Sequence, residues 1–332
     1  MRLGLFTTLS FALLLPLAVS AQSSGGLFGE TGKTFTISAA PQYPIPLSVA
    51  TLSFLSNSLD LANAALTVSA NGKSIYQGST QPVSVTLGKA GSITTVAATI
   101  SVGGATYKQT LSIQPQDVAL IAEPISSSPP LYPGKSSVPL EGDVRVVAVA
   151  NFRNASGQAV NPATLSYSWT VDDTKIANSS GVGKEALIVA SPIQYSARNV
   201  SVSITNPDGS LVGGASVSLL PLDPSVRIYE NDPLLGIRFD RALSNDYTIS
   251  GSEATLYAAP FSFPTTNRAP LLQWFLNGSA AQTGSSITLR PTGNGQGNAS
   301  LSLVSSSGTF TTATANLLLS FGESSGFNLF GL

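Results

Sequence analysis

Apolar and polar residues alternate along most of the chain beyond residue 34, at the two-residue period of a β-strand. The clearest runs are residues 200–204, 215–219 and 299–303, in which an aliphatic residue or alanine alternates with serine. Because successive side chains of a strand point to opposite faces, each run predicts a half-buried strand. Outside the first 21 residues, a helical period appears only at residues 59–65, which is too short for more than a turn or two between strands.

Three segments share one pattern, an apolar pair two residues apart that is followed by a turn. The pairs are Leu66 and Val68, Tyr167 and Trp169, and Leu272 and Trp274, and the turns are Asn71-Gly72, Asp172-Asp173 and Asn277-Gly278. Successive copies lie roughly 100 residues apart, which is the length of one β-sandwich domain. We therefore expect each pair to lie in the core of its own sandwich.

The flanks of these turns repeat as well. A strand-like run precedes each turn at residues 48–54, 143–149 and 253–258, and a hairpin follows it at residues 93–113, 200–219 and 299–319. The agreement in order and spacing predicts an all-β chain with three tandem sandwiches, at residues 34–115, 116–222 and 223–322. Short proline-bearing seams at residues 114–117 and 221–224 separate them. Residues 22–33 are predicted to be a flexible segment and residues 323–332 an apolar tail.

The first 21 residues have the layout of a secretory signal peptide. Arg2 supplies a positive start, residues 3–17 are apolar, and small residues precede a cleavage point after Ala21. An uncleaved anchor helix is the alternative, although the apolar run is at the short end for a membrane span. The sequence thus predicts an exported protein, located outside the cell, at its surface or in the periplasm of a two-membrane cell. Membrane contact is expected only if this segment is kept as an anchor.

Composition excludes several kinds of chemistry. The chain has no histidine and no cysteine, so it cannot build a Ser-His-Asp or Cys-His centre or a zinc site of the Cys/His type. Only 10% of the residues are charged and the net charge is −1, so a nucleic-acid partner is not expected. Carboxylates are sparse and scattered, which makes a carboxylate-based hydrolase the least favoured function. The sequence predicts a non-catalytic protein without a cofactor, whose sandwiches are stabilised by apolar burial alone.

Two of the turn segments carry a resemblance to a known family. Tyr167 and Trp169 before Asp172-Asp173, and Trp274 before Asn277-Gly278, resemble the third strand of immunoglobulin-like and PKD-like modules of bacterial surface proteins. This resemblance implies three tandem immunoglobulin-like sandwiches with the tryptophans between the sheets. The first repeat departs from the pattern, since Val68 stands where a tryptophan would lie. Residues 129–134 and 180–184 look like features of uncharacterised exported proteins from small-genome, candidate-phylum bacteria, for which no biochemical role can be carried over.

Two acidic residues occupy corresponding seams. Asp117 and Asp223 are candidate calcium ligands, because carboxylates at module seams can bind Ca²⁺. Capping of a turn is the simpler alternative for each carboxylate. The short run of residues 180–184 is too short for a phosphate-binding loop and is read as a loop between strands.

The apolar tail is a candidate docking peptide for another protein's exposed strand edge or groove. Its apolar residues are Phe327, Leu329, Phe330 and Leu332. The alternative is a tail that folds back on its own sandwich.

Two function classes follow. The favoured one is a structural or adhesive surface protein that presents immunoglobulin-like modules to a protein or cell-envelope component. The alternative is a secreted accessory protein that binds a glycan or another polymer through exposed aromatic residues. The candidates for that surface are Tyr132, Tyr229, Tyr247, Phe261 and Phe263. Alternation places Phe261 and Phe263 in the core instead.

Overall fold

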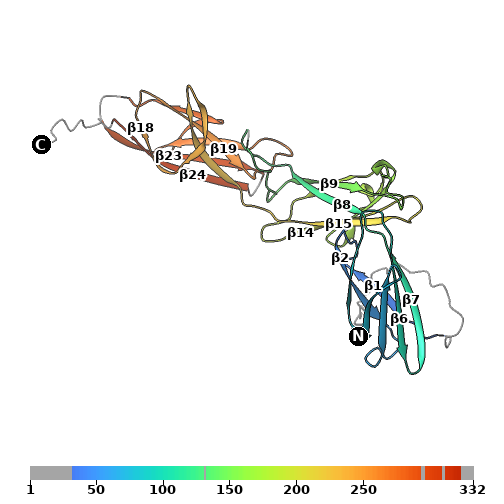
Figure 1. The fold of residues 1–332 in the computed structure, drawn as a ribbon. Coiled ribbons are helices and arrows are strands. Elements are labelled where there is room, and N and C mark those ends of the chain that lie inside the picture. Colours follow the sequence, from blue (N-terminus) through green and yellow to red (C-terminus); the bar gives the residue numbers. More distant parts are fainter. Residues whose placement is uncertain (1–31, 131, 293–295, 309–310, 323–332) are drawn as a thin grey trace, which may run out of the picture. The chain divides into compact units, whose positions relative to one another are not determined.

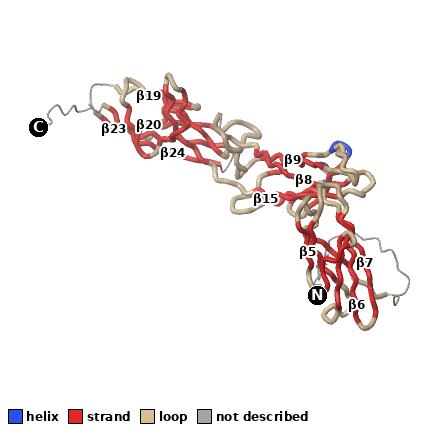
Figure 2. The backbone as a smooth tube through the Cα atoms, in the orientation of Figure 1, coloured by secondary structure: helices blue, strands red, loops and turns tan. Residues whose placement is uncertain are grey.

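The computed structural model describes residues 32–130, 132–292, 296–308 and 311–322. Strands and loops make up almost all of this part of the chain, and its helical content is two short 3₁₀ turns, Pro162–Thr164 and Ala177–Ser179 (Figure 2). No helix in the described ranges is long and apolar enough to cross a membrane. The predicted all-β fold class of tandem immunoglobulin-like sandwiches is confirmed.

The first sandwich lies in a compact unit that ends at Gln114. It pairs a three-stranded sheet, ordered β1-β2-β5, with a four-stranded sheet, ordered β4-β3-β6-β7. Figure 1 labels β1, β2, β6 and β7 of this sandwich. The strands are β1 (Thr36–Ala40), β2 (Val49–Leu55), β3 (Ala65–Ala70), β4 (Lys73–Ser79), β5 (Val83–Thr86), β6 (Thr94–Val102) and β7 (Ala105–Ile113). Inward residues of both sheets form one core around Val68, which is fully buried. Residues 59–64 form a bend and a turn rather than a helix, and Ala65 begins β3.

The second sandwich begins the other compact unit, which starts at Pro115. One sheet has the order β13-β9-β8, and the other has the order β11-β10-β14-β15 with β12 also paired to β10. The strands are β8 (Asp117–Pro124), β9 (Asp143–Asn151), β10 (Ser166–Val171), β11 (Thr174–Lys175), β12 (Gly181–Val182), β13 (Ala186–Ala190), β14 (Arg198–Thr205) and β15 (Val212–Leu219). Residues 180–184, read from the sequence as a loop, therefore include a short strand. Trp169 and Tyr167 lie in the core of the second sandwich.

The third sandwich has two strands more than the first. Its sheets are ordered β17-β16-β19-β22 and β18-β24-β23-β20-β21. The strands are β16 (Ser225–Asp232), β17 (Gly236–Leu243), β18 (Asn245–Ile249), β19 (Ala254–Phe261), β20 (Leu271–Leu276), β21 (Ser279–Thr283), β22 (Ser286–Leu289), β23 (Gly297–Ser307) and β24 (Thr311–Phe321). The additions are β17, which forms a hairpin with β16, and β18, which pairs in parallel with β24. Trp274 is fully buried between the sheets.

The core strands β3, β10 and β20, one in each sandwich, end in the turn that the sequence repeats. Both central residues of each turn have positive φ: 48° and 79° at Asn71-Gly72, 45° and 64° at Asp172-Asp173, and 49° and 80° at Asn277-Gly278. Positive φ at both positions is the geometry of a type I′ hairpin turn, whose twist matches that of the flanking strands. The turns join β3 to β4, β10 to β11 and β20 to β21.

Backbone hydrogen bonds join the second and third sandwiches. They run between the segment that follows β8 and the segment that follows β19. Ser127 donates from its amide to the carbonyl of Phe263 at 2.7 Å, and it accepts at its own carbonyl from the amide of Ser262 at 3.0 Å. The Ser127 hydroxyl oxygen accepts from the amide of Phe263 at 3.1 Å, and Thr265 donates to the carbonyl of Ile125 at 3.2 Å. These bonds hold the segment that follows β8 against the segment that follows β19.

Candidate functional site

The outer face of the sheet β17-β16-β19-β22 carries a row of aromatic rings. Tyr229 on β16 lies directly opposite Tyr257 on β19. Phe261 lies on the same strand, four residues after Tyr257. Side chains at even spacing on one strand share a face, so these rings lie on one side of the sheet. Phe239 joins them from β17, and Tyr132 joins them from the segment between β8 and β9. We call the five residues Tyr132, Tyr229, Phe239, Tyr257 and Phe261 the aromatic strip.

Neighbouring rings of the aromatic strip meet edge to face. The ring centroids are 5.5 Å apart for Tyr132 and Phe261, 5.2 Å for Tyr229 and Phe239, and 6.0 Å for Phe239 and Tyr257, with interplanar angles of 69–89°. This arrangement places the positive edge of one ring against the negative face of the next, which is favourable by about 0.5–1.5 kcal/mol per pair. The contacts hold the rings in fixed positions.

A cation lies over one end of the strip. The guanidinium carbon of Arg227 is 5.5 Å from the centroid of the Phe261 ring, and the Arg227 residue is exposed. An arginine at this distance is attracted to the ring face by a cation–π interaction. Arg227 therefore covers part of Phe261 while its charged group stays in water.

The aromatic residues that the sequence suggested as a binding surface differ in their exposure and location. Tyr132 is 45% exposed and Phe261 is half-buried, and both belong to the strip. Tyr229 also belongs to it but is only 5% exposed, so it supports the strip from below rather than offering a surface. Phe263 is fully buried, as alternation indicated. Phe261 is not, because it lies on the outer face of β19.

Tyr247 lies away from the strip, on β18 against the core of the third sandwich. Its hydroxyl donates to Oε1 of Glu230 at 3.1 Å. Burial and the nearby Glu230 carboxylate raise the pKa of Tyr247 to about 12. The Tyr247 phenol thus stays neutral and acts as a donor at physiological pH.

The sequence did not reveal Phe239, Tyr257 or Arg227 as partners of this surface. Tyr257 stands in a run that alternation correctly marks as a strand, but only the pairing with β16 shows which rings it meets. Phe239 lies on β17, a strand with no counterpart in the other two sandwiches. Burial raises the pKa of the Tyr257 hydroxyl above its ordinary value, so this phenol is also neutral near pH 7.

The paired apolar residues of the repeats lie between the sheets. Val68, Trp169 and Trp274 are fully buried, and Tyr167 and Leu272 are 1% and 8% exposed. Each indole N–H has a partner, because Nε1 of Trp169 donates to the carbonyl of Lys184 at 2.8 Å and Nε1 of Trp274 donates to that of Gly284 at 2.9 Å. Residues 180–184 thus supply the hydrogen-bond acceptor for the indole N–H of Trp169, a role that could not be predicted from their sequence.

The two seam carboxylates lie far apart along the second sandwich. Asp117 is on β8 and accepts from Nδ2 of Asn151 at 3.1 Å, whereas Asp223 accepts from Nε2 of Gln194 at 3.2 Å. Both partners are side chains, and no backbone amide of the described residues caps either carboxylate in a turn. No group of three or more His, Cys, Asp or Glu side chains that could hold a metal gathers within the described ranges. Each carboxylate thus serves to join two neighbouring segments.

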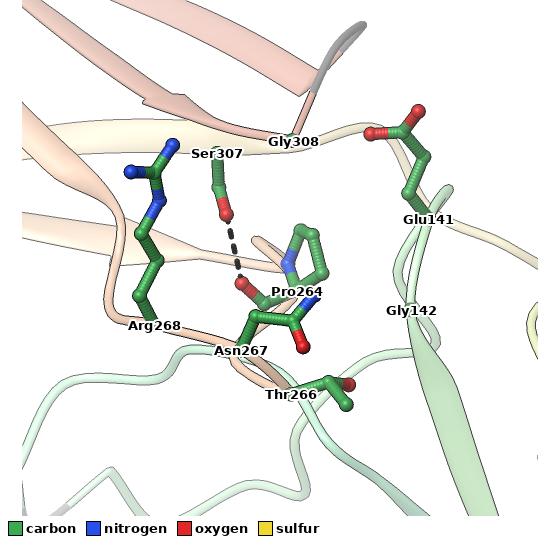
Figure 3. A pocket seen from close by; sticks show the side chains of 8 residues that line it. All are labelled: Glu141, Gly142, Pro264, Thr266, Asn267, Arg268, Ser307 and Gly308. Carbon is green, nitrogen blue, oxygen red and sulfur yellow. Dashed lines mark hydrogen bonds between the residues drawn. The ribbon is translucent and has the colours of Figure 1, made fainter.

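A cavity lies at the junction of the second and third sandwiches (Figure 3). It measures about 510 Å³, and Glu141 and Arg268 lie on opposite sides of it with Pro264 between them. Ser307 donates to the carbonyl of Pro264 at 2.9 Å, and Thr311 donates to Oε2 of Glu141 at 2.7 Å. The Glu141 carboxylate is therefore committed to joining β24 to the second sandwich. The cavity is therefore an interdomain crevice with one acidic side chain, Glu141, and one basic side chain, Arg268, on opposite sides.

Exposed apolar side chains gather on the second sandwich. Ile193 and Tyr195, in the loop between β13 and β14, are 75% and 95% exposed, and Leu220 and Leu222, in the segment that leads to β16, are 64% and 56% exposed. The hydrogen bond between Gln194 and Asp223 holds these two segments side by side. We call Ile193, Tyr195, Leu220 and Leu222 the linker patch. The candidate docking residues Phe327, Leu329, Phe330 and Leu332, by contrast, lie outside the described residues.

No protein-family model and no curated protein sequence matches the chain. Among solved structures, it is similar to the three N-terminal domains of the highly immunogenic outer capsid protein of bacteriophage RB49, at 11% identity and a TM-score of 0.25 over 88% of this chain and 99% of that one. It is also similar to a central fibronectin-III array of RIM-binding protein, at 9% identity and a TM-score of 0.29 over 86% and 96% of the two chains. A third similarity is to immunoglobulin domains 1–5 of Sidekick-1, at 12% identity and a TM-score of 0.29 over 88% and 60%. All three TM-scores are low, and the fold is established by the strand pairing of the chain itself.

Proposed function

We propose that this chain is a non-catalytic, exported bacterial surface protein that presents its immunoglobulin-like sandwiches to a protein or another component of the cell envelope. The linker patch is the observation that carries this proposal. Four large apolar side chains, each more than half exposed, lie on two segments joined by a hydrogen bond. Large apolar side chains that are exposed together on neighbouring segments are typical of a site of contact with another molecule.

The patch is suited to contact because it is held in place on a rigid module. Ser196 donates from its amide to the carbonyl of Ile193 at 3.1 Å, which closes a turn between the two exposed residues. The amide of Leu222 donates to the carbonyl of Val138 at 2.9 Å. Pre-ordered side chains lose little conformational entropy on binding, so a small apolar surface can contribute to affinity.

The test is binding of the full-length protein to isolated envelope from the cell that produces it. The double variant Ile193→Ser with Leu222→Ser should lose most of the bound fraction, while its circular dichroism stays that of the parent. Leu318→Ser is the matched control, because Leu318 is 53% exposed on β24 of the third sandwich. Equal envelope binding by the double variant and the parent contradicts a contact role for the patch.

The apolar tail gives the proposal a second contact element. Phe327, Leu329, Phe330 and Leu332 would dock in a partner's groove or along its strand edge. Deletion of residues 323–332 should release the protein from the cell surface into the medium, as measured by fractionation. Unchanged retention rules out the tail as the tether and leaves the linker patch to be tested alone.

The aromatic strip favours a second candidate function, binding of a glycan or another neutral polymer. Tyr132 and Phe261 are accessible, and their neighbours hold them in fixed orientations. Fixed aromatic rings supply large contact areas at a low cost in conformational entropy. Loss of glycan-array signal in Tyr132→Ala, with an unchanged signal in Tyr195→Ala on the second sandwich, would support this function over contact through the linker patch.

A further inference from the structure

A second cavity lies beside the aromatic strip and is distinct from the junction cavity of Figure 3. It measures about 400 Å³, and its walls come from the segment after β8, from β19 and from the segment between β19 and β20. We call it the proline–hydroxyl groove, because Pro129, Pro130, Pro260 and Pro270 line it together with hydroxyl side chains. Its volume falls within the range of sites that hold small molecules.

Three residues that line the groove carry side-chain hydroxyls that no other described residue engages. Tyr257, Thr265 and Ser285 line it, and none of their side-chain hydroxyls has a hydrogen-bond partner among the described residues. The other lining hydroxyls are already engaged. Ser126 donates to the carbonyl of Ser137 at 2.6 Å, and Ser127 accepts from the amide of Phe263 at 3.1 Å. The lining therefore includes a tyrosine, a threonine and a serine, from three different segments, whose hydroxyls have no partner among the described residues.

The groove differs from the junction cavity in charge. Glu141 and Arg268 line the junction cavity, whereas the described residues that line the proline–hydroxyl groove include no Asp, Glu, Lys or Arg. A charged ligand leaves water only when an opposite charge or several strong hydrogen bonds replace its hydration. The groove has no such charge to offer, so it suits a neutral ligand that carries many hydroxyl groups of its own.

The apolar part of the groove lining also suits such a ligand. The proline rings present carbon-bound hydrogens, and Tyr257 belongs to both the groove and the aromatic strip. A pyranose has the complementary surface, with apolar C–H faces and hydroxyls around its edge. We propose that the proline–hydroxyl groove binds one or two units of a neutral oligosaccharide, with Tyr257, Thr265 and Ser285 bonded to its hydroxyls. This inference rests on the second candidate function and does not need the linker patch.

A proline-rich peptide is the main competing ligand, because such segments bind in grooves lined by aromatic residues. In this groove the described lining has one aromatic residue, Tyr257, and the apolar walls are prolines themselves. Stacked aromatic rings that would separate successive prolines of a peptide are missing from that lining. The observations therefore favour the sugar, and peptide binding becomes an outcome that overturns the proposal.

The experiment is isothermal titration of the full-length protein with cellohexaose, chitohexaose, laminarihexaose and xylohexaose, and with a decaproline peptide. We expect at least one hexasaccharide to bind and the peptide to give no heat. Tyr257→Phe, Thr265→Val and Ser285→Ala should each weaken that binding by roughly 2- to 12-fold, because each removes one net hydrogen bond. The matched controls Tyr195→Phe and Ser252→Ala, at exposed positions away from the groove, should bind as the parent does.

A filling variant tests the location without touching a proposed ligand-binding group. Ala269 lines the groove and is exposed, so Ala269→Trp should abolish sugar binding while the unfolding transition stays that of the parent. If this variant unfolds, amide shifts in the parent on addition of sugar locate the site instead. Shifts centred on Thr265 and Ser285 support the groove.

The proposal is overturned if no hexasaccharide binds more tightly than about 10 mM, a dissociation constant that corresponds to a few kcal/mol. It is also overturned if decaproline binds, or if the three groove variants bind as tightly as the parent. Binding that is lost in Tyr132→Ala but kept in all groove variants would support the glycan function at the strip and reject the groove. A negative result in the sugar titrations does not bear on envelope binding by the linker patch, which is measured separately. Failure of the groove proposal and failure of the proposed envelope contact can therefore be told apart.

Discussion

The backbone amide of Asn199 donates a 2.9 Å hydrogen bond to Oδ1 of Asp172, and the amide of Asp172 donates back to the carbonyl of Asn199 at 2.9 Å. The same reciprocal pair joins the first turn residue to the neighbouring strand in the other sandwiches. Its members are Asn71 with Thr95, and Asn277 with Ser300, at 2.8–2.9 Å. The turn is thereby tied to β6, β14 or β23, the strand that pairs with the core strand. This tie explains why an Asn or Asp recurs at the first position of all three turns.

The turn acceptor should contribute measurably to the stability of the second sandwich. Asp172→Ala removes the acceptor and places alanine at a φ of 45°, so we expect a loss of about 1–3 kcal/mol in the free energy of unfolding. Asp172→Asn keeps an acceptor oxygen and should stay within about 0.5–1 kcal/mol of the parent, since it loses only an exposed ion pair with Arg198. Urea denaturation measures both. Equal losses in the two variants would show that the charge matters and the acceptor does not.

The second turn residue allows a stabilising change. Asp173 has a φ of 64°, whereas Gly72 and Gly278 occupy the corresponding positions in the other sandwiches. Glycine adopts this conformation without strain, so Asp173→Gly should raise the free energy of unfolding by up to about 1 kcal/mol. Asp173→Ala also removes the charge but keeps the strain, and it should give no gain. A gain of the same size in Asp173→Ala would contradict the backbone explanation.

The sequence was sufficient for the elements whose information is local. Alternation and Asn-Gly or Asp-Asp turns mark β3, β10 and β20 and the hairpins that follow them, because strand period and turn conformation depend on neighbouring residues. It did not predict β17, β18 or the bonds of Ser127 to Phe263, since these depend on partners far away in the chain. The aromatic strip shows the same limit. Tyr132 and Phe261 were candidates, but their contact requires the junction that brings residues 132 and 261 together.

The indole hydrogen bonds predict a large effect of tryptophan replacement. Trp169→Phe removes part of the core volume and the donor to the Lys184 carbonyl, so we expect a loss of about 2–4 kcal/mol. Trp274→Phe should cost a similar amount through the Gly284 carbonyl. Since the chain has two tryptophans, each variant leaves one indole as a fluorescent reporter. A change below about 0.5 kcal/mol would be typical of a surface position and would contradict the core role.

Close packing at the junction makes Gly142 sensitive to substitution. Its φ is 115°, and a Cβ atom at this position would lie 2.8 Å from Cβ of Pro264 in the third sandwich. Gly142→Ala should therefore combine backbone strain with a steric clash and cost about 2–4 kcal/mol. Gly157→Ala is the matched control, because Gly157 also has positive φ, 82°, but has open space around its Cβ direction. If calorimetry shows equal losses for the two, the junction contact adds nothing to stability.

Buried tyrosines predict how stability falls in alkaline solution. Burial, together with the nearby Glu185 carboxylate, raises the pKa of Tyr167 from 10.0 to about 12. The folded state thus holds this proton more tightly than the unfolded state, and stability is lost as the pH rises from about 10 to about 12. The contribution of Tyr167 to the free energy of unfolding is at most about 3 kcal/mol.

Tyr167→Phe should flatten that alkaline slope. At neutral pH it should cost about 1 kcal/mol, because the hydroxyl donates to the carbonyl of Pro162 at 3.2 Å. Urea denaturation at about pH 8, 10 and 11.5 compares the variant with the parent. The parent's advantage in the free energy of unfolding should shrink as the pH rises above about 10, and the variant should be the more stable protein at about pH 11.5. An advantage that stays constant would mean that Tyr167 ionises alike in both states, and that its burial between the sheets does not govern its proton.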